Sequence, residues 1–201
     1  MPTDSNNIPR DPVGLLVTAE WLAFADRLTQ DNLEHVVLET ARQAALAGFA
    51  GLELPIPHAT HLFHTHGETF WERMADTLET VGCPICTVHG PTFAPLDTPL
   101  QKAAEALEAT ARIASACRAK VLVVHPTPHS HPHVTDIAAR LLERDTALCH
   151  AVGDQLTGPT RLAVENLPTY GIAHLTRIMQ QVPHPRVGVC FDTGHWNVRP
   201  E

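Results

Sequence analysis

The sequence predicts an α/β fold in which short parallel strands alternate with amphipathic helices. Short runs rich in Val, Ile and Leu recur along the chain, and between them lie stretches with apolar residues at helical spacing. The strand runs are continuously apolar, which is typical of parallel strands covered on both faces. Because no Pro- or Ser-rich linker interrupts this alternation, we expect a single domain over 13–201 that follows a flexible N-terminal segment over 1–12.

Six of these runs fit strands in length and composition. The intervals between them leave room for one helix after each strand. The expected strands are Leu15–Val17, Gly51–Leu54, Ile85–His89, Val121–His125, Leu162–Glu165 and Val187–Asp192.

Five stretches place apolar residues three or four positions apart, so that one face of each helix is apolar. Asp31 and Glu34 form a capping pattern at the start of the first stretch, and Gly48 is its stop signal. Pro99 suits the first turn of the third stretch. The expected helices are 33–47, 68–81, a stretch opened by Asp97-Thr98-Pro99 that continues through Ala114, 135–152 and 171–181.

The composition excludes several classes of protein. Apolar residues make up 44% of the 201 residues, which is ordinary for a globular chain, and no run approaches the ~18 apolar residues of a membrane span. A formal net charge of −8 and only two lysines count against binding duplex nucleic acid through its phosphates. The start lacks the basic leader and apolar core of a signal peptide, and the five cysteines show no disulfide spacing. We therefore expect a cytoplasmic protein without a membrane partner.

Two α/β architectures fit the alternation, an open doubly wound sheet and a closed barrel. An open sheet usually carries a Gly-rich phosphate loop after an early strand, and neither GxGxxG nor GxxxxGK[ST] occurs in the sequence. Instead, an ionisable residue stands at the end of each of five successive strands. This pattern favours a (β/α)8 TIM-type barrel, of which the chain supplies the first six units. The strand-end residues are Glu53, His89, His125, Glu165 and Asp192, with His195 three positions further on.

These residues are candidate metal ligands. The carboxyl ends of barrel strands converge on one face, where active sites lie. Several ionisable groups gathered there are costly unless an ion compensates their charge, and a divalent cation is the simplest solution. Taken singly, each has an ordinary explanation. A strand-end histidine is more often hydrogen-bonded in a loop, and Glu53 also fits a salt bridge or a helix cap.

Histidines also cluster in two segments that we expect to be loops on the same face. They could add ligands or contact an anionic substrate, but exposed loop histidines are the default interpretation. The two groups are His58, His61, His64 and His66 after the second strand, and His129, His131 and His133 after the fourth.

The sequence resembles the xylose isomerase-like barrels, which include sugar phosphate isomerases/epimerases and endonuclease IV. The resemblance covers the chain from about residue 13 to its end, and the last two of its motifs are the most specific. The motifs are Gly48-Phe49-Ala50-Gly51-Leu52-Glu53-Leu54, Val88-His89-Gly90-Pro91, Val124-His125-Pro126, Val164-Glu165-Asn166-Leu167-Pro168 and Cys190-Phe191-Asp192-Thr193-Gly194-His195-Trp196-Asn197.

The resemblance implies roles for particular residues. Glu165 and Asp192 would be metal ligands, and Glu165 would also move a proton. His195 would contact the substrate in a sugar enzyme or bind a further metal in a nuclease, and we also expect Glu53 to contact substrate. His89 and His125 match positions that hold an additional zinc ion in nuclease-like members of the family.

The leading functional hypothesis is a divalent-metal-dependent isomerase or epimerase that acts on a sugar or sugar phosphate through an enediolate-type proton transfer. Mixed carboxylate and imidazole ligands suit Mn²⁺, Zn²⁺ or Co²⁺. One alternative is an endonuclease IV-like zinc phosphodiesterase acting on abasic DNA, which the two histidines favour and the negative net charge disfavours. The other is a non-catalytic, incomplete barrel that needs a partner chain.

Only six strands can be placed before Glu201, whereas a complete barrel has eight units and typically ~250 residues. The family's later ligands, a histidine after the sixth helix and a glutamate on the last strand, have no counterpart here. Six strands alone would leave two unpaired edges and part of an apolar interior exposed. We therefore expect a shortened or split gene, or a homo-oligomer or completing chain that covers the open edges.

Overall fold

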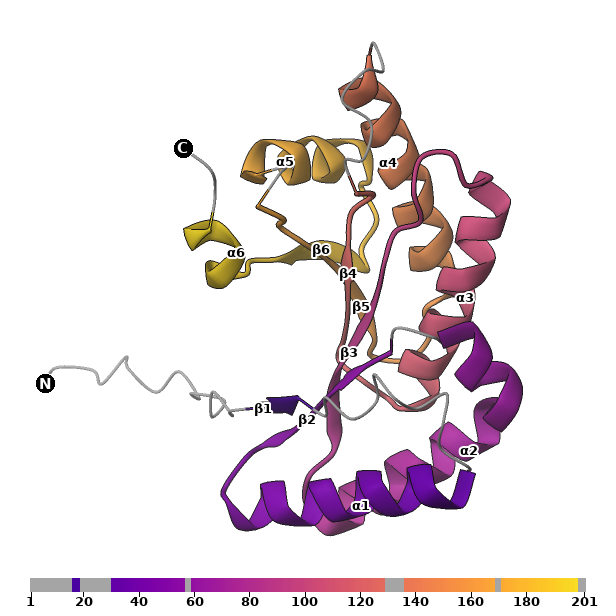
Figure 1. Ribbon diagram of the computed structural model, residues 1–201, viewed down its shortest axis with the longest axis vertical. Coiled ribbons are helices and arrows are strands. Elements are labelled where there is room, and N and C mark those ends of the chain that lie inside the picture. Colours follow the sequence, from indigo (N-terminus) through magenta and orange to yellow (C-terminus); the bar gives the residue numbers. More distant parts are fainter. Residues whose placement is uncertain (1–15, 19–29, 57–58, 129–135, 169–170, 199–201) are drawn as a thin grey trace, which may run out of the picture.

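The computed structural model describes residues 16–18, 30–56, 59–128, 136–168 and 171–198. Within them strands and helices alternate along the chain (Figure 1). The strands are β1 (Leu16–Thr18), β2 (Gly51–Pro55), β3 (Ile85–Thr92), β4 (Val121–His125), β5 (Arg161–Glu165) and β6 (Val187–Cys190). The helices are α1 (Gln30–Leu46), α2 (Ala59–Val81), α3 (Leu100–Ala116), α4 (Ile137–Gln155), α5 (Gly171–Gln181) and α6 (Thr193–Asn197).

The six strands form one parallel sheet in which each strand pairs with the next along the chain. In Figure 1, helices α1 to α5 follow one another in an arc along the outer side of this sheet. A parallel sheet in sequential order with an outer layer of helices is the arrangement of a (β/α)8 barrel. The predicted fold class is therefore confirmed, with six β/α units in the described part of the chain.

The alternation of side chains along each strand determines which residues enter the core. On β2, Leu52 and Leu54 are fully buried in the cluster between sheet and helices, whereas Glu53 between them is only partly buried. The middle of β3 repeats this pattern, because Val88 is fully buried and His89 is partly exposed. The sheet therefore seals the apolar core on its outer side and presents ionisable side chains on its inner side.

Apolar side chains are also exposed at one edge of the described sheet. Val189 on β6 is 46% exposed, and Phe191 and Trp196, which follow it, are 51% and 43% exposed. Exposed apolar groups at a sheet edge fit the expected homo-oligomer or completing chain, which stays a prediction.

Among the described residues, no helix has the length and apolar character needed to cross a bilayer.

Two details of the helices differ from the sequence-based expectation. Helix α2 begins at Ala59, so His61, His64 and His66 lie on a helix and not in a loop. The helical pattern was obscured because Gly67 interrupts α2 with a left-handed backbone (φ 71°). Helix α1 begins at Gln30, so Asp31 lies inside its first turn and does not precede it.

The expected N-terminal segment and four histidines lie outside the described residues: His58, His129, His131 and His133.

The start of β2 leaves no room for a side chain at Gly51. A Cβ atom there would lie 2.5 Å from Cys86 Sγ and 2.6 Å from the carbonyl oxygen of Pro84. Gly51→Ala is therefore expected to lower the free energy of unfolding by about 1–3 kcal/mol, measured by urea denaturation. Gly188→Ala on β6 is the matched control, because the nearest atom to its Cβ would be 4.0 Å away. Equal stability of the two variants would contradict this packing argument.

Candidate metal centre

Glu165, the last residue of β5, lies at the centre of the candidate site. It is only 3% exposed. Three histidine rings face its carboxylate: His89 Nε2 at 3.6 Å, His125 Nε2 at 3.5 Å and His195 Nδ1 at 3.1 Å. The rings come from the middle of β3, the end of β4 and α6, so the parallel sheet brings together residues that are far apart in the sequence.

Two groups of side chains in this cluster have the geometry to hold a metal ion. One consists of His89, His125 and Glu165, and the other of Glu165, Asp192 and His195; within each group the ligand atoms lie within 4.8 Å of one another. Glu165 belongs to both groups. Carboxylate oxygen and imidazole nitrogen are common donors for Mn²⁺, Co²⁺ and Zn²⁺. All four residues that we predicted to be metal ligands are thus assembled in one place, and their role as ligands stays a prediction.

Glu53 lies next to His89, on the side of the ring that faces away from Glu165. Its Oε1 is 3.7 Å from His89 Nδ1, the ring nitrogen opposite the one that faces Glu165. This contact with Glu53 is the main reason that the pKa of His89 is raised above 6.5; Glu165 and Asp192 add to the effect, and burial opposes it. A carboxylate behind a histidine orients the ring and strengthens it as a ligand. The structure therefore places Glu53 beside the candidate ligands.

Asn166 ties the ends of β5 and β6 together. Its side-chain oxygen accepts a hydrogen bond from the Asp192 amide (2.6 Å), and its amide nitrogen donates to the Asp192 carbonyl (2.9 Å). Asp192 in turn caps α6 by accepting from the His195 amide (2.8 Å), which is the main cause of its lowered pKa. The carbonyl of Asn166 lies 2.9 Å from His195 Nδ1, so a neutral ring protonated at Nδ1 would leave the lone pair of Nε2 free to accept a hydrogen bond or to bind a metal ion.

Two residues at the site received no role from the sequence. Cys190 pairs with Glu165 in the β5–β6 register. Burial, with the nearby carboxylates Glu165, Asp192 and Glu53, raises the pKa of its thiol to about 11, so the thiol is protonated at neutral pH. Its position two residues before Asp192 was an available signal, because alternate residues of a strand share a face. Asn166 stood in a quoted motif, but its contacts with Asp192 depend on tertiary structure.

A concavity of about 390 Å³ opens beside His89 and His125. It offers space for a small ligand next to the first group of candidate metal ligands. Its lining consists of Pro55, Ile56, His89, Gly90, Pro91, Thr92 and His125.

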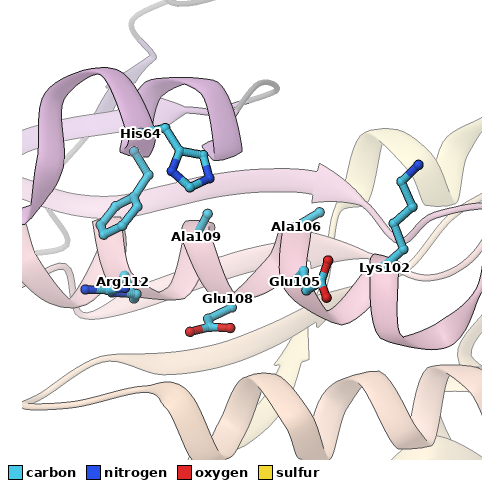
Figure 2. A pocket seen from close by; sticks show the side chains of 8 residues that line it. His64, Lys102, Glu105, Ala106, Glu108, Ala109 and Arg112 are labelled. Carbon is cyan, nitrogen blue, oxygen red and sulfur yellow. The ribbon is translucent and has the colours of Figure 1, made fainter.

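The histidines of α2 lie elsewhere. The His66 ring stacks on Phe70, with ring centroids 4.8 Å apart. Figure 2 shows His64 above α3, at a groove of about 420 Å³ between α2 and α3. Arg112 lies over the Phe63 ring in this groove, 4.4 Å from its centroid. These contacts place both histidines in the outer helical layer rather than among the candidate metal ligands.

Residues 41–201 match the family model of the xylose isomerase-like TIM barrel, so the chain belongs to this family. The expected family is confirmed. A comparison with curated protein sequences gives no match.

Several solved structures share the fold. One is described as the probable 3-DHS dehydratase AsbF of Bacillus anthracis (18% identity, TM-score 0.65, 92% of this chain and 65% of that one). Another is the 3-keto-D-glucoside 4-epimerase YcjR of E. coli (17% identity, TM-score 0.61, 82% of this chain and 66% of that one). A third is a D-allulose 3-epimerase of Methylomonas sp. (13% identity, TM-score 0.61, 84% of this chain and 60% of that one). The chain thus covers between 60% and 66% of the length of these three proteins. At these identities the likeness shows the fold alone.

The contact between Glu53 and His89 predicts a pH-dependent contribution to stability. Because the pKa of His89 is above 6.5 in the folded protein, the charged ring stabilises the fold below that pH. This stabilisation is lost as the pH rises through the raised pKa. In metal-free protein, wild type should therefore gain stability relative to Glu53→Gln as the pH falls from about 8 to about 5.5.

Urea denaturation at several pH values measures this difference, and NMR titration of the His89 ring should show a lower midpoint in Glu53→Gln. Glu39→Gln is the control, because Glu39 pairs with Arg42 on the surface of α1, 3.9 Å apart, and is not among the groups that raise the pKa of His89. An unchanged His89 midpoint in the Glu53 variant would contradict the assigned cause.

Proposed function

We propose that the protein is a divalent-metal-dependent isomerase or epimerase that acts on a sugar or sugar phosphate. The observation that carries this proposal is the convergence of Glu165, Asp192 and His195 at the carboxyl ends of the strands of a xylose isomerase-like barrel. The names of two proteins with the same fold, a 3-keto-D-glucoside 4-epimerase and a D-allulose 3-epimerase, support the substrate class.

The side chains themselves fit a metal ion. Glu165 is a buried carboxylate with no Lys or Arg ion pair among the described residues; three imidazole rings and the Asp192 carboxyl group face it. His125 Nε2 is buried and has no hydrogen-bond partner within the described ranges. Burial of the Glu165 carboxylate and of His125 Nε2, 3.5 Å apart and without a hydrogen bond between them, costs free energy of folding. A cation bound by both groups would compensate this cost. Glu165, Asp192, His125 and His89 would supply the ligands for Mn²⁺, Zn²⁺ or Co²⁺, with His125 and His89 in the first group and Asp192 in the second.

When bound, the cation would act as a Lewis acid that polarises the carbonyl of the substrate. Glu165 takes the proton from the carbon beside that carbonyl, and the electron pair left behind forms the enediolate. Return of the proton to the former carbonyl carbon, together with transfer of the proton of the neighbouring hydroxyl to the enediolate oxygen, completes an isomerisation and regenerates the carboxylate. An epimerisation instead returns a proton from the opposite face, which requires a second acid across from Glu165.

His195 and Glu53 orient the substrate in this proposal. The short helix α6 holds the His195 ring beside Glu165, where Nε2 of the charged ring can donate a hydrogen bond to a substrate hydroxyl or to the developing oxyanion. Glu53 is 25% exposed and can accept a hydrogen bond from a hydroxyl group. Donors and acceptors placed in this way suit a polyol, because each hydroxyl of a sugar both donates and accepts.

Glu165→Gln is expected to lose both the metal and the activity, because it keeps the shape of the side chain but removes the charge and the base. We expect bound metal, measured by elemental analysis, to fall at least about tenfold. Deuterium uptake from D₂O at the carbon beside the carbonyl of a ketose or ketose phosphate, followed by NMR, should fall by about 100-fold or more.

Glu143→Gln, an exposed position on α4, is the matched control and should behave as wild type. Unchanged metal content in Glu165→Gln would refute the proposed ligand. A wild-type protein that holds metal but exchanges no proton on any sugar tested would favour the non-catalytic alternative.

A second function, hydrolysis of a phosphodiester at abasic sites in DNA, is favoured by one observation. His89, His125 and Glu165 form a His₂Glu group, a ligand set found in catalytic zinc sites. The net charge of −8 argues against it, because a nuclease needs a basic surface beside the site. Zn²⁺-loaded protein is therefore expected not to nick an abasic duplex oligonucleotide at physiological salt, in a gel assay. Nicking that is lost in His89→Ala would reverse the order of the two functions.

A further inference from the structure

Two consecutive charged residues on α4, Arg144 and Asp145, are buried. Arg144 is 8% exposed and Asp145 is fully buried. Burying a charged group costs several kcal/mol unless hydrogen bonds and opposite charges compensate it. The partners of these two side chains therefore show which parts of the fold they hold in place.

Asp145 holds the segment that follows β4. Its Oδ1 accepts hydrogen bonds from both the amide (3.0 Å) and the hydroxyl (2.5 Å) of Thr127. Its Oδ2 lies 2.8 Å from His174 Nε2 on α5. Thr127 is itself fully buried and stands two residues after His125. The backbone that leaves the His125 position is thus fixed to α4 by two bonds to one carboxylate oxygen.

Arg144 holds the segment that follows β3. Its Nε donates to the carbonyl of Ala94 (3.3 Å), and its Nη1 donates to the carbonyl of Thr98 (2.8 Å). This segment leaves the strand that carries His89. Because a guanidinium donates from several nitrogens in one plane, a single side chain fixes two points of the segment at once.

The two segments also contact each other. The amide of Phe93 donates to the carbonyl of His125 (2.9 Å), and Thr92 pairs with His125 in the strand register. The Thr92 hydroxyl lies 3.5 Å from His125 Nδ1, on the opposite side of the ring from the nitrogen that faces Glu165. The ends of β3 and β4 are therefore joined to one another, and both are joined to adjacent residues of one helix.

We propose that Arg144 and Asp145 are positioning residues that set the spacing of the His89 and His125 rings toward Glu165. They act through the backbone and touch neither ring. The two rings must face one carboxylate from different strands, and their centroids are only 5.0 Å apart. Loops that moved independently would not keep this distance, whereas two loops held by one helix move together. The metal readout of this inference rests on the proposed function.

The test uses Thr127→Val, because Asp145→Ala could unfold the protein. Val has nearly the shape of Thr but removes the hydroxyl that donates to Asp145, and Thr127→Ser keeps it. Thr160→Val is the matched control: Thr160 is also fully buried, and its hydroxyl donates to the carbonyl of Ala119 (2.7 Å), just before β5 begins and away from the strand ends that carry the site.

Co²⁺ is titrated into each variant and its visible absorption is recorded, with thermal unfolding measured in parallel. We expect Thr127→Val to bind Co²⁺ about tenfold more weakly than wild type, and Thr127→Ser and Thr160→Val to bind it as wild type does. If Thr127→Val and Thr160→Val lose similar thermal stability and both retain wild-type Co²⁺ affinity, Asp145 has only a structural role and the inference is wrong.

A metal-free readout separates this inference from the proposed function. Histidine-ring NMR signals, assigned with His89→Gln, His125→Gln and His195→Gln, should shift for His125 in Thr127→Val but not for His195. If wild type binds no Co²⁺, the proposed metal site is refuted, and the inference is decided by these signals alone. An unmoved His125 signal in Thr127→Val would overturn it.

Discussion

The burial of the Glu165 carboxylate is the constraint on which the rest of the candidate site depends. A carboxylate that is 3% exposed must be compensated by positive charge or by several hydrogen-bond donors. Here the compensating groups are imidazole rings from β3, β4 and α6. Imidazole compensates a carboxylate either as a charged ring or, when neutral, together with a metal cation. The same arrangement therefore suits both a metal-free protein at mildly acid pH and a metal-loaded protein at neutral pH.

The fold and the strand-end residues could be predicted because both follow from local patterns. A continuous apolar run that leads into a Glu, His or Asp marks a buried parallel strand, although β2 and β3 run past Glu53 and His89 to Pro55 and Thr92. Gly48 ends α1 with a left-handed backbone (φ 84°), as its position suggested. The first half of α2 was missed because Gly67 and the crowded histidines hide its periodicity. Gly67 separates two helical halves at a kink, and the structure is needed to show that the first half is helical.

The parts of the site that could not be predicted depend on contacts between distant elements. Asp145 has the sequence context of an ordinary helical residue, and its role becomes visible only when α4 packs beside the end of β4 and Thr127 reaches its carboxylate. Asn166 is similar, because its two hydrogen bonds to the Asp192 backbone require β5 and β6 to lie side by side. Residues that support a site in this way leave no periodic signal. Proteins of this fold also carry names as different as dehydratase and epimerase, so chemistry must be argued from such site residues and not from the barrel.

The presence of Glu165 in both candidate groups has a thermodynamic consequence. If both groups bind ions, the first ion to arrive withdraws electron density from the shared carboxylate, repels the second ion through it, and at the same time fixes the side chain in a bridging orientation. The two binding events are then coupled, and the coupling free energy is the same whichever group fills first. In that case Glu165 would couple the two sites, and the balance of repulsion against preorganisation would set the sign of the cooperativity.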